Sequence, residues 1–339
     1  MTNKEKALEL IGTFSSGDTA KAKELLAKDY IQHNLAYETG ADAFVAAVKY
    51  LASAPVKTTV NNIRVFEDGD KVFLQTVYNF AGTGEQVAFD IFRFNADGKI
   101  AEHWDNLAAK AEANPSGHTQ VDGTLEKKNV DKEETRKVVS KFVGDVLRGE
   151  NLDKFTSYFD GDNYIQHNVA IADGVSGLGV ALEAMAKQGI QMIYNKTHFV
   201  LADGDYALAV SEGSFAGTPT TFYDLFRVEN GKIAEHWDNL ATKASVNPSG
   251  HSQIDGYDNL DGLEKYKNKH VLYLELGVGG NTPIIIKYPF WQMVYENSNA
   301  VYACLNYQES YCPKEIVERS ICVDGDIFEV LQELESKGV

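Results

Sequence analysis

Two sets of acidic and histidine side chains recur in this sequence with almost the same spacing. Their members are Asp90, His103 and Asp105 in the first set and Asp224, His236 and Asp238 in the second. The first aspartate of each set lies between an aromatic and an aliphatic residue, so we expect its carboxylate to point into a partly dry space. Desolvation makes a carboxylate a stronger base, which suits a general acid or base. The pattern predicts proton transfer on an organic substrate.

The same residues are also compatible with structural roles. Asp90 could form an ion pair with Arg93, three residues further along, and the second set offers the same option. Strand alternation places His103 and Asp105 on one face and the intervening Trp104 on the other, so only one of these faces can line a pocket. The pair would then be either a histidine oriented by a carboxylate or part of a polar network at an interface or sheet edge.

Two further histidines, His33 and His167, occur in the segment Tyr-Ile-Gln-His-Asn, which is present twice. We expect each at the end of a helix, where the chain turns toward a sheet. An imidazole there could transfer protons near neutral pH, or its ring nitrogens could satisfy backbone groups of the turn. The pocket wall would be formed by the large aromatic residues of the same motifs, namely Tyr30, Trp104, Tyr164 and Trp237.

These motifs recur because the first three quarters of the chain contain one module twice. Tyr-Ile-Gln-His-Asn at residues 30–34 returns at 164–168, and Lys-Ile-Ala-Glu-His-Trp-Asp-Asn-Leu-Ala at 99–108 returns at 232–241. Solenoid repeats have periods of roughly 20–50 residues, so this much longer period indicates a duplicated domain. The expected organisation is a first domain (1–123), a linker (124–132), a second domain (133–256), a second linker (257–269) and a tail (270–339).

Within each copy, apolar residues recur first at helical spacing and then at strand spacing. The predicted helices lie within 4–26 and over 41–52 in the first copy, and over 133–147, 152–158 and 179–188 in the second. The predicted strands are 58–66, 71–80, 87–94 and 100–107, then 194–201, 206–215, 220–228 and 233–240. Helices followed by an antiparallel meander are typical of the α+β class.

Together these features resemble the SnoaL-like branch of the nuclear-transport-factor-2-like (NTF2-like) superfamily across both copies. The resemblance rests on the helix-then-sheet order, the Tyr-Ile-Gln-His-Asn segment, the Asp-apolar-Phe-Arg strands and the Gly-Lys-Ile-Ala-Glu-His-Trp motif. It implies two cone-shaped α+β barrels, each with a deep apolar pocket that the histidine of the first segment borders. It also implies frequent dimerisation through the sheet. Members include polyketide cyclases and isomerases that move protons on carbon.

One departure from the related cyclases affects the expected activity. Those enzymes carry an acid/base aspartate four residues after the tryptophan, where this sequence has Ala108 and Ala241. We therefore expect a small-molecule pocket protein, which is either a cofactor-free proton-transfer isomerase or cyclase acting on a small apolar carbonyl compound, or a binder of an apolar molecule. As an enzyme it would use Asp90 or Asp224 as the base. A third alternative is a structural pseudo-dimer, and no metal site is expected.

The tail resembles the C-terminal part of the sirtuin family, particularly its bacterial branch, through Leu-Glu-Leu-Gly-Val-Gly-x-Asn-Thr-Pro and Ile-Ile-Lys-Tyr-Pro-Phe. Its pattern of strand, Gly-rich loop, helix and strand predicts a small Rossmann-like α/β fragment. The resemblance implies contacts to the adenosine side of NAD from Gly277, Gly279, Asn281, Thr282 and Asn306. The Gly-Ala-Gly loop, catalytic histidine and zinc cysteines of sirtuins have no counterpart upstream. We expect no deacylase or ADP-ribosyltransferase activity and no cofactor, with NAD binding by the tail as the alternative.

Composition limits the partners. The net charge of −17, with no basic cluster, argues against nucleic acid. The sequence has no apolar run of about 18 residues and no signal-like start, which argues against membrane insertion and secretion. Three cysteines without paired spacing favour reduced thiols. We expect a cytoplasmic protein that binds a small apolar molecule, with its two copies packed sheet to sheet as an intrachain pseudo-dimer and room for further oligomerisation.

Overall fold

The computed structural model of the chain describes residues 1–243, 246–254, 270–278 and 286–336. The chain divides into two compact units, Met1–Tyr257 and Asp258–Val339. Both sequence repeats lie in the first unit, and the tail forms the second. No helix in the described parts of the chain has the length and apolar character needed to span a membrane.

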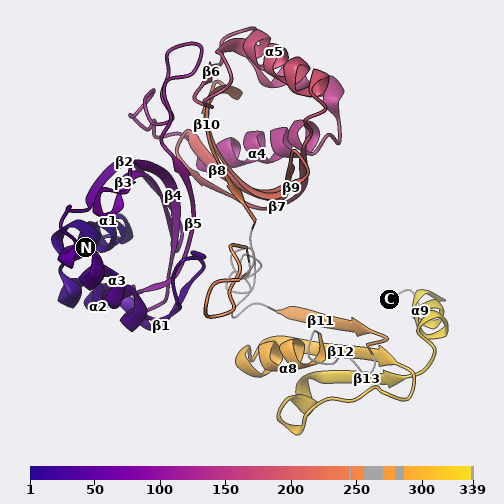
Figure 1. Cartoon of the computed structure of the whole chain (residues 1–339). Helices are drawn as coiled ribbons and strands as arrows, with labels where there is room; N and C mark the ends of the chain where they lie inside the picture. Colours follow the sequence, from indigo (N-terminus) through magenta and orange to yellow (C-terminus); the bar gives the residue numbers. More distant parts are fainter. Residues whose placement is uncertain (244–245, 255–269, 279–285, 337–339) are drawn as a thin grey trace. The chain divides into compact units, whose positions relative to one another are not determined.

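The first repeat begins with helices that cover one side of its sheet (Figure 1). They are α1 (Asn3–Ser16), α2 (Thr19–Leu25) and, after the first strand, α3 (Ala41–Ser53). The first helix starts at a capping box, in which the Thr2 hydroxyl accepts from the Glu5 backbone and the Glu5 carboxylate accepts from the Thr2 backbone. It ends at Gly17, whose positive φ of 74° favours glycine. Buried apolar side chains on α1 and α3 then hold both helices against the core.

The first sheet has the strand order β1-β5-β4-β3-β2. Its strands are β1 (Leu26–Gln32), β2 (Thr59–Asp68), β3 (Lys71–Asn79), β4 (Gln86–Phe94) and β5 (Ile100–Ala109). The meander is antiparallel as predicted, but β1 pairs in parallel with β5, and the sequence analysis missed it. The segment around Tyr30 is therefore a strand and not the end of a helix. This strand places Gln32 opposite His103 in the sheet.

The second repeat forms a second sheet with the equivalent order, β6-β10-β9-β8-β7. Its strands are β6 (Ile165–Gln166), β7 (Met192–Asp203), β8 (Tyr206–Phe215), β9 (Thr218–Glu229) and β10 (Lys232–Thr242). Its helices are α4 (Lys132–Phe142), which continues in a π-helical turn (Val143–Leu147), a 3₁₀ segment (Leu152–Tyr158) and α5 (Gly174–Lys187). The last helix begins earlier than the predicted 179–188.

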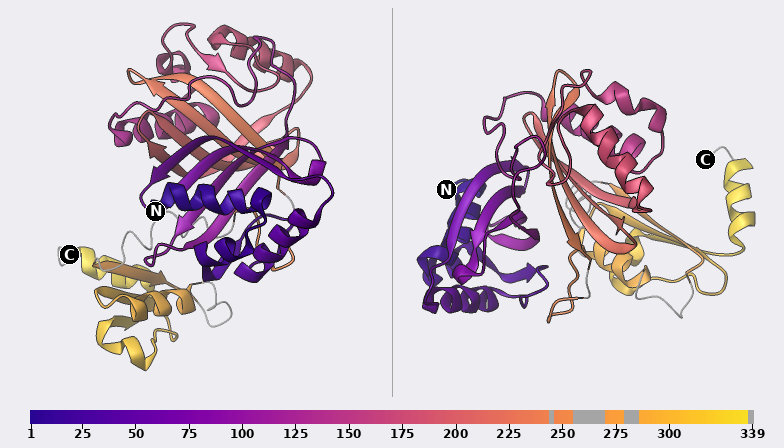
Figure 2. Two further views of the ribbon diagram at one scale, coloured as in Figure 1. Left: turned by 90° about the vertical axis from the view of Figure 1, so that its left-hand side faces the viewer. Right: turned by 45° about the horizontal axis from the view of Figure 1, so that its top comes forward.

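The two repeats contact each other through their sheets, with the helices on the outer sides (Figure 2). Two equivalent asparagines meet at the centre, where the Asn106 side chain donates to the Asn239 carbonyl and the Asn239 side chain donates to the Asn106 carbonyl, both at 3.2 Å. The segment after each sheet reaches the other repeat. Asn114 donates to the Gln166 carbonyl at 2.6 Å, and Asn247 donates to the Gln32 carbonyl at 2.7 Å.

The C-terminal unit contains a three-stranded parallel sheet in the order β11-β12-β13. Its elements are β11 (Val271–Leu276), α8 (Lys287–Glu296), β12 (Ala300–Asn306), β13 (Ser320–Asp324) and α9 (Ile327–Ser336). The predicted strand, helix and strand correspond to β11, α8 and β12, whereas β13, which is short and partly exposed, was not predicted. The Lys287 ammonium and the Glu275 carboxylate form a fully buried ion pair of 2.6 Å beneath this sheet.

Candidate functional site

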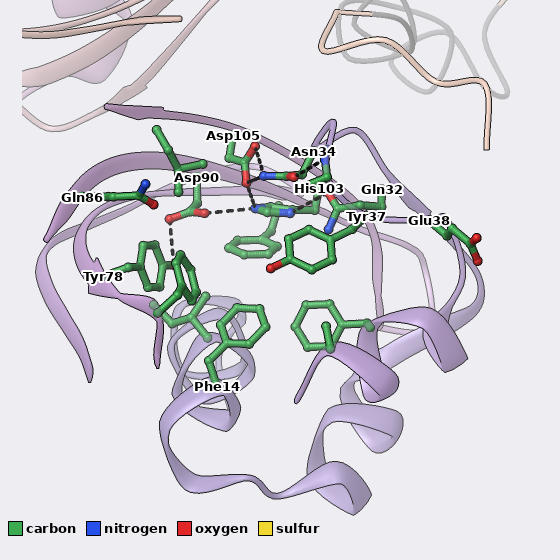
Figure 3. Close-up of a pocket in the computed structure, with 17 residues that line it drawn as sticks. Phe14, Gln32, Asn34, Tyr37, Glu38, Tyr78, Gln86, Asp90, His103 and Asp105 are labelled. Atoms are coloured by element: carbon green, nitrogen blue, oxygen red, sulfur yellow. Dashed lines mark hydrogen bonds and ion pairs between the residues drawn. The ribbon is translucent and has the colours of Figure 1, made fainter. Parts of the chain in front are cut away.

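The first triad is assembled by the pairing of β4 with β5. Asp90 lies directly opposite Asp105 in the antiparallel register, and His103 lies two residues before Asp105 on the same face. The His103 Nε2 atom is 3.0 Å from Asp90 Oδ1 and 4.0 Å from Asp105 Oδ2 (Figure 3). Directly opposed like charges destabilise a sheet. A proton held by the imidazole or by one of the carboxyl groups therefore relieves this repulsion.

A glutamine from β1 fixes the tautomer of this histidine. The Gln32 Oε1 atom accepts the Asn34 backbone N–H at 3.0 Å, which identifies it as the amide oxygen. The same oxygen is 2.9 Å from His103 Nδ1, so Nδ1 carries a proton and donates. The Gln32 amide nitrogen donates in turn to the Tyr30 hydroxyl at 3.0 Å. With Nδ1 protonated, Nε2 is the atom that exchanges a proton.

Asp90 and His103 must share at least one proton. The Nε2 atom of this tautomer has no hydrogen when the ring is neutral, so its contact with the Asp90 carboxylate needs either an imidazolium or a protonated carboxyl. The second Asp90 oxygen accepts the Tyr78 hydroxyl at 2.9 Å. Burial raises the pKa of Tyr78 well above its ordinary value, so this hydroxyl remains a donor. Both oxygens of Asp90 are thus occupied.

Asp105 is the carboxylate of the triad with spare capacity to accept a proton. Its two oxygens accept only from the Asn34 side-chain amide, at 3.0 and 2.8 Å, among the hydrogen bonds that the structure gives it. Burial raises the pKa of Asp105 to about 6; the charge of His103 opposes this shift and that of Asp90 adds to it. A carboxylate with this pKa can gain and lose a proton near neutral pH.

The triad faces a cavity of about 220 Å³ inside the first repeat. Helices α1 and α3 and strands β3 and β4 supply most of an aromatic wall, whose members are Phe14, Phe44, Tyr78, Phe80 and Phe92. Figure 3 shows Phe14 across the cavity from the polar cluster of His103 and the two aspartates. Phe92 lies beside this cluster and stacks on the His103 ring, with ring centroids 4.4 Å apart. The geometry suits a small ligand with an apolar body and a polar group directed at the triad.

The second repeat carries an equivalent triad. His236 Nε2 lies 3.1 Å from Asp224 Oδ1, and its Nδ1 donates to Gln166 Oε1 at 3.0 Å. The Asn168 amide donates to Asp238 at 2.6 Å. Burial raises the pKa of Asp238, as it does for its counterpart in the first repeat. The same proton-sharing arrangement therefore occurs twice in the chain.

The structure does not place His33 and His167 at the cavity, which corrects the expectation that they face a pocket. His33 Nδ1 donates to the Ser252 carbonyl at 2.9 Å, and its Nε2 donates to Glu102 at 2.8 Å. The equivalent bonds of His167 are to the Thr119 carbonyl at 2.8 Å and to Glu235 at 2.9 Å. Both nitrogens of each ring are thus engaged in hydrogen bonds at the contact between repeats. The alternative role, satisfying backbone groups, describes them better.

The expected wall residues also lie elsewhere. Trp104 and Trp237 point away from the triads and stack on His33 and His167, with ring centroids 4.7 and 4.6 Å apart. The reason is strand alternation, which puts each tryptophan on the face opposite the neighbouring histidine. Tyr30 and Tyr164 are fully buried, and their hydroxyls accept the amides of Gln32 and Gln166. They hold the two glutamines that bind the triad histidines.

Three supporting residues were missed by the sequence analysis. Gln32 and Asn34 belong to the repeated Tyr-Ile-Gln-His-Asn segment, so their recurrence was a usable signal. Tyr78 left no such signal, because its equivalent in the second repeat is Gly213. The predicted alternative of an ion pair between Asp90 and Arg93 is not formed, since Arg93 binds Glu102 at 2.8 Å.

Three groups among the described residues bring histidine and carboxylate atoms close enough for a metal ion to contact them all. They are the two triads and a group made of His118, Asp122 and His167. In each triad the histidine Nε2 already shares a proton with an aspartate. His167 already donates through both nitrogens. Proton sharing accounts for the short contacts within both triads.

Of the five residues proposed to contact NAD, Gly279, Asn281 and Thr282 lie outside the described residues. Gly277 follows β11 with a positive φ of 66°. Asn306 ends β12, and its side-chain amide donates to the Val278 carbonyl at 2.8 Å, which ties the two strand ends together. Asn306 also lines a hollow of about 440 Å³ with residues that follow β13.

Comparison with known proteins agrees with this description of the first repeat. Residues 7–103 match the model of the SnoaL-like domain. Solved structures similar to this chain include an NTF2-like protein of unknown function from Cytophaga hutchinsonii (17% identity, TM-score 0.28) and a steroid delta-isomerase from Pseudomonas aeruginosa (20% identity, TM-score 0.26). Each alignment covers 32% of this chain, and 91% and 81% of those chains.

One curated protein is also similar to a stretch of this chain. It is a protein ADP-ribosyltransferase of Staphylococcus aureus, 39% identical over 77 residues, or 23% of this chain. The chain spans about a quarter of the length of that relative, 24%.

Proposed function

We propose that the first repeat catalyses proton transfer at carbon on a small carbonyl compound with an apolar body. The observation that carries the proposal is the buried Asp90, His103 and Asp105 triad at one wall of an otherwise largely aromatic cavity. Asp105, and not Asp90 as expected from the sequence, takes the proton from the carbon next to the carbonyl group and returns it to another position or to the same one, because both oxygens of Asp90 are already occupied. Asp90 and His103 share a proton beside it, which limits the charge that accumulates in the cavity.

The substrate class follows from the chemistry of the site. A carboxylate with a pKa of about 6 is a moderate base, so it can remove a proton only from a carbon whose carbanion is stabilised, such as one next to a carbonyl group. The residues named require no cofactor for this step. The SnoaL-like match over 7–103 supports the proposal, because isomerases and cyclases of this branch move protons on carbon.

The test measures hydrogen exchange on a probe ketone. The methyl protons of 2-acetylnaphthalene exchange with deuterium oxide when an enzyme forms the enolate, and proton NMR follows their loss. We expect wild-type protein to accelerate the exchange and Asp105→Asn to reduce it by about 100-fold or more. The matched control is Asp238→Asn in the second repeat, which should retain the activity of the first. Exchange at the buffer rate in wild-type protein would refute catalysis.

A binding role without catalysis is the second candidate. The observation in its favour is Ala108, which occupies the position of the acid/base aspartate in the related cyclases and lies on β5 opposite Val87. Under this proposal 2-acetylnaphthalene binds, but its methyl protons do not exchange. The exchange experiment therefore separates the two candidates in one measurement.

We also propose that the repeats are two SnoaL-like domains packed as an intrachain pseudo-dimer. The contact of the equivalent Asn106 and Asn239 supports this, because equivalent residues meet on the axis of a two-fold pair. Lys4 and Asp203 join the repeats through an ion pair of 3.0 Å. A carbodiimide should couple these two side chains, and mass spectrometry should detect the linked peptides in wild type and not in Lys4→Arg. A product with no link between repeats would contradict the packing.

For the C-terminal unit we propose a sirtuin-like segment without deacylase or ADP-ribosyltransferase activity of its own. The parallel pairing of β11 with β12, and the position of Asn306 at the end of β12, support a relation to the sirtuin family. The segment that is similar to the ADP-ribosyltransferase is short enough to fit within the C-terminal unit. NAD at millimolar concentration should leave the melting temperature of the full chain unchanged. A stabilisation that Asn306→Ala removes would show that the unit binds NAD.

A further inference from the structure

The mouth of the first cavity carries a polar group that the triad does not use. Tyr37 lines the cavity, and Figure 3 shows its ring reaching inward with the hydroxyl directed toward the centre. The structure gives this hydroxyl no hydrogen-bond partner among the described residues. The residue is 37% exposed, so it lies where the cavity opens to solvent.

The second repeat has an apolar residue at the equivalent place. The Asn34 side chain accepts the Ala36 backbone N–H at 2.9 Å, and the Asn34 carbonyl accepts the Tyr37 backbone N–H at 3.3 Å. Asn168 forms the same two bonds, at 2.9 and 3.3 Å, with Ala170 and Ile171. The backbone of the two turns is therefore the same. Ile171 stands where the first repeat has Tyr37 and cannot donate a hydrogen bond.

At a second position, too, the first cavity has a hydrogen-bond donor that the second repeat lacks. Gln86 lines the first cavity, and in Figure 3 its amide end is directed toward the ligand space. The equivalent residue of the second repeat is Thr220. Gln86 on β4 pairs with Tyr78 near the end of β3, and Thr220 on β9 pairs with Gly213 near the end of β8. The Thr220 hydroxyl already donates to the Thr218 carbonyl at 2.8 Å. The second repeat therefore has no spare donor at either place.

We propose that Tyr37 is the specificity-determining donor of the first site, which hydrogen-bonds the carbonyl oxygen of the ligand, and that the second repeat does not select for such an oxygen. This inference rests on the proposed function. When Asp105 takes the proton from the adjacent carbon, the electrons of the broken C–H bond form a C=C bond and the carbonyl electrons move to oxygen. The Tyr37 hydroxyl keeps its proton and stabilises that oxygen. Burial and the charge of Asp105 raise the pKa of Tyr37, which keeps the hydroxyl protonated.

The experiment compares a ketone with a hydrocarbon of similar shape. The probes are 2-acetylnaphthalene and 2-ethylnaphthalene, and the variants are Tyr37→Phe and, as the matched control at the equivalent position, Ile171→Val. We expect Tyr37→Phe to weaken ketone binding about five- to tenfold and to leave hydrocarbon binding within twofold. The infrared carbonyl band of the bound, ¹³C-labelled ketone should shift to higher frequency in Tyr37→Phe, because a hydrogen bond to the oxygen is lost. Ile171→Val should change neither result.

Two outcomes would overturn the inference. One is an equal change in affinity for both probes in Tyr37→Phe, which would mean that the ring and not the hydroxyl contacts the ligand. The other is a carbonyl band that is the same in wild type and Tyr37→Phe. Neither depends on catalysis. If wild-type protein fails to exchange the methyl protons but shows the band shift and the ketone preference, the proposed function fails and the role of Tyr37 stands.

Discussion

In the first repeat the hydroxyl that donates to the triad comes from Tyr78 on β3, whereas in the second it comes from Tyr194 on β7. Strand β7 occupies the position in the second sheet that β2 occupies in the first, next to the equivalent of β3. Val60 pairs with Tyr78 in the first repeat, and Tyr194 pairs with Gly213 in the second. The tyrosine has thus exchanged places with its cross-strand partner. A Cβ atom at Gly213 would lie 1.8 Å from the Ile193 carbonyl, so that position accepts no larger side chain.

This exchange shows which parts of the site the fold constrains. The triad and its glutamine and asparagine partners occupy equivalent positions in both repeats, because β1 and β6 deliver the amides to the histidine in the same register. The hydroxyl needs only to reach one carboxylate oxygen, and a side chain from either of two adjacent strands can do so. The outer helices differ more. Helix α3 buries Phe44 and Val48, whereas α5 exposes Val180 at 69%.

The largest difference we expect between the repeats concerns their buried ion pairs. Glu235 is fully buried and accepts from His167 at 2.9 Å and Arg227 at 2.8 Å. Glu235→Gln leaves the buried Arg227 guanidinium and the His167 ring without their carboxylate partner and should cost about 3 kcal/mol in urea unfolding at pH 7. Glu102→Gln in the first repeat should cost less, because its partner Arg93 is 17% exposed.

The pH dependence of this loss has a defined direction. Burial raises the pKa of Glu235, but the hydrogen bonds from His167, Arg227 and Thr124 outweigh it and lower the pKa to about 2. A lowered carboxylate pKa stabilises the folded state above the ordinary value of 4.5, and the stabilisation is lost as the pH falls toward 2. The difference between wild type and Glu235→Gln should therefore shrink over that range. A difference that is constant from pH 7 to pH 2.5 would contradict the assignment.

The hydrogen bonds of Tyr78 and Tyr194 to the triad aspartates should differ in their contribution to stability, because they differ in length. Tyr78→Phe removes a 2.9 Å hydrogen bond to a buried carboxylate and should cost about 2 kcal/mol. Tyr194→Phe removes longer contacts of 3.2 and 3.3 Å and should cost about 1 kcal/mol. Urea unfolding of the two variants measures both losses. Equal losses would show that the strand supplying the hydroxyl makes no energetic difference.

Asp105→Asn should stabilise the protein at neutral pH. The raised pKa of about 6 means that the folded state holds a proton more strongly than the unfolded chain, so stability falls as the pH rises from about 4 to 6. Asparagine removes this cost and keeps an oxygen for the Asn34 amide. We expect a gain of about 2 kcal/mol at pH 7.5 and none at pH 4. A gain of the same size at both pH values would mean that ionisation of Asp105 is not its cause.

The sequence predicted the meander, the helices before it and the placement of His103 and Asp105 on one face, because these features depend on local periodicity. It missed β1, whose parallel partner β5 is distant in the chain and whose polar ends, including Gln32, carry no strand pattern. That omission placed His33 in the cavity. In β1 the side chains alternate, so Gln32 faces His103 and His33 faces Glu102. A repeated motif identifies candidate functional residues but does not show which face of the strand each of them occupies.

The smallest effect of a single substitution is expected on α5, at one of two equivalent positions in the outer helices. Val48 on α3 is fully buried, and Leu182 on α5, its counterpart at the repeat spacing, is 42% exposed. Val48→Ala should cost about 2 kcal/mol, since it removes two buried carbons and leaves a cavity. Leu182→Ala should change the free energy of unfolding by less than about 0.5 kcal/mol, because its side chain loses little contact and alanine favours the helix. If Leu182→Ala were as costly as Val48→Ala, α5 would have to be covered in solution, by the second sheet or by another molecule.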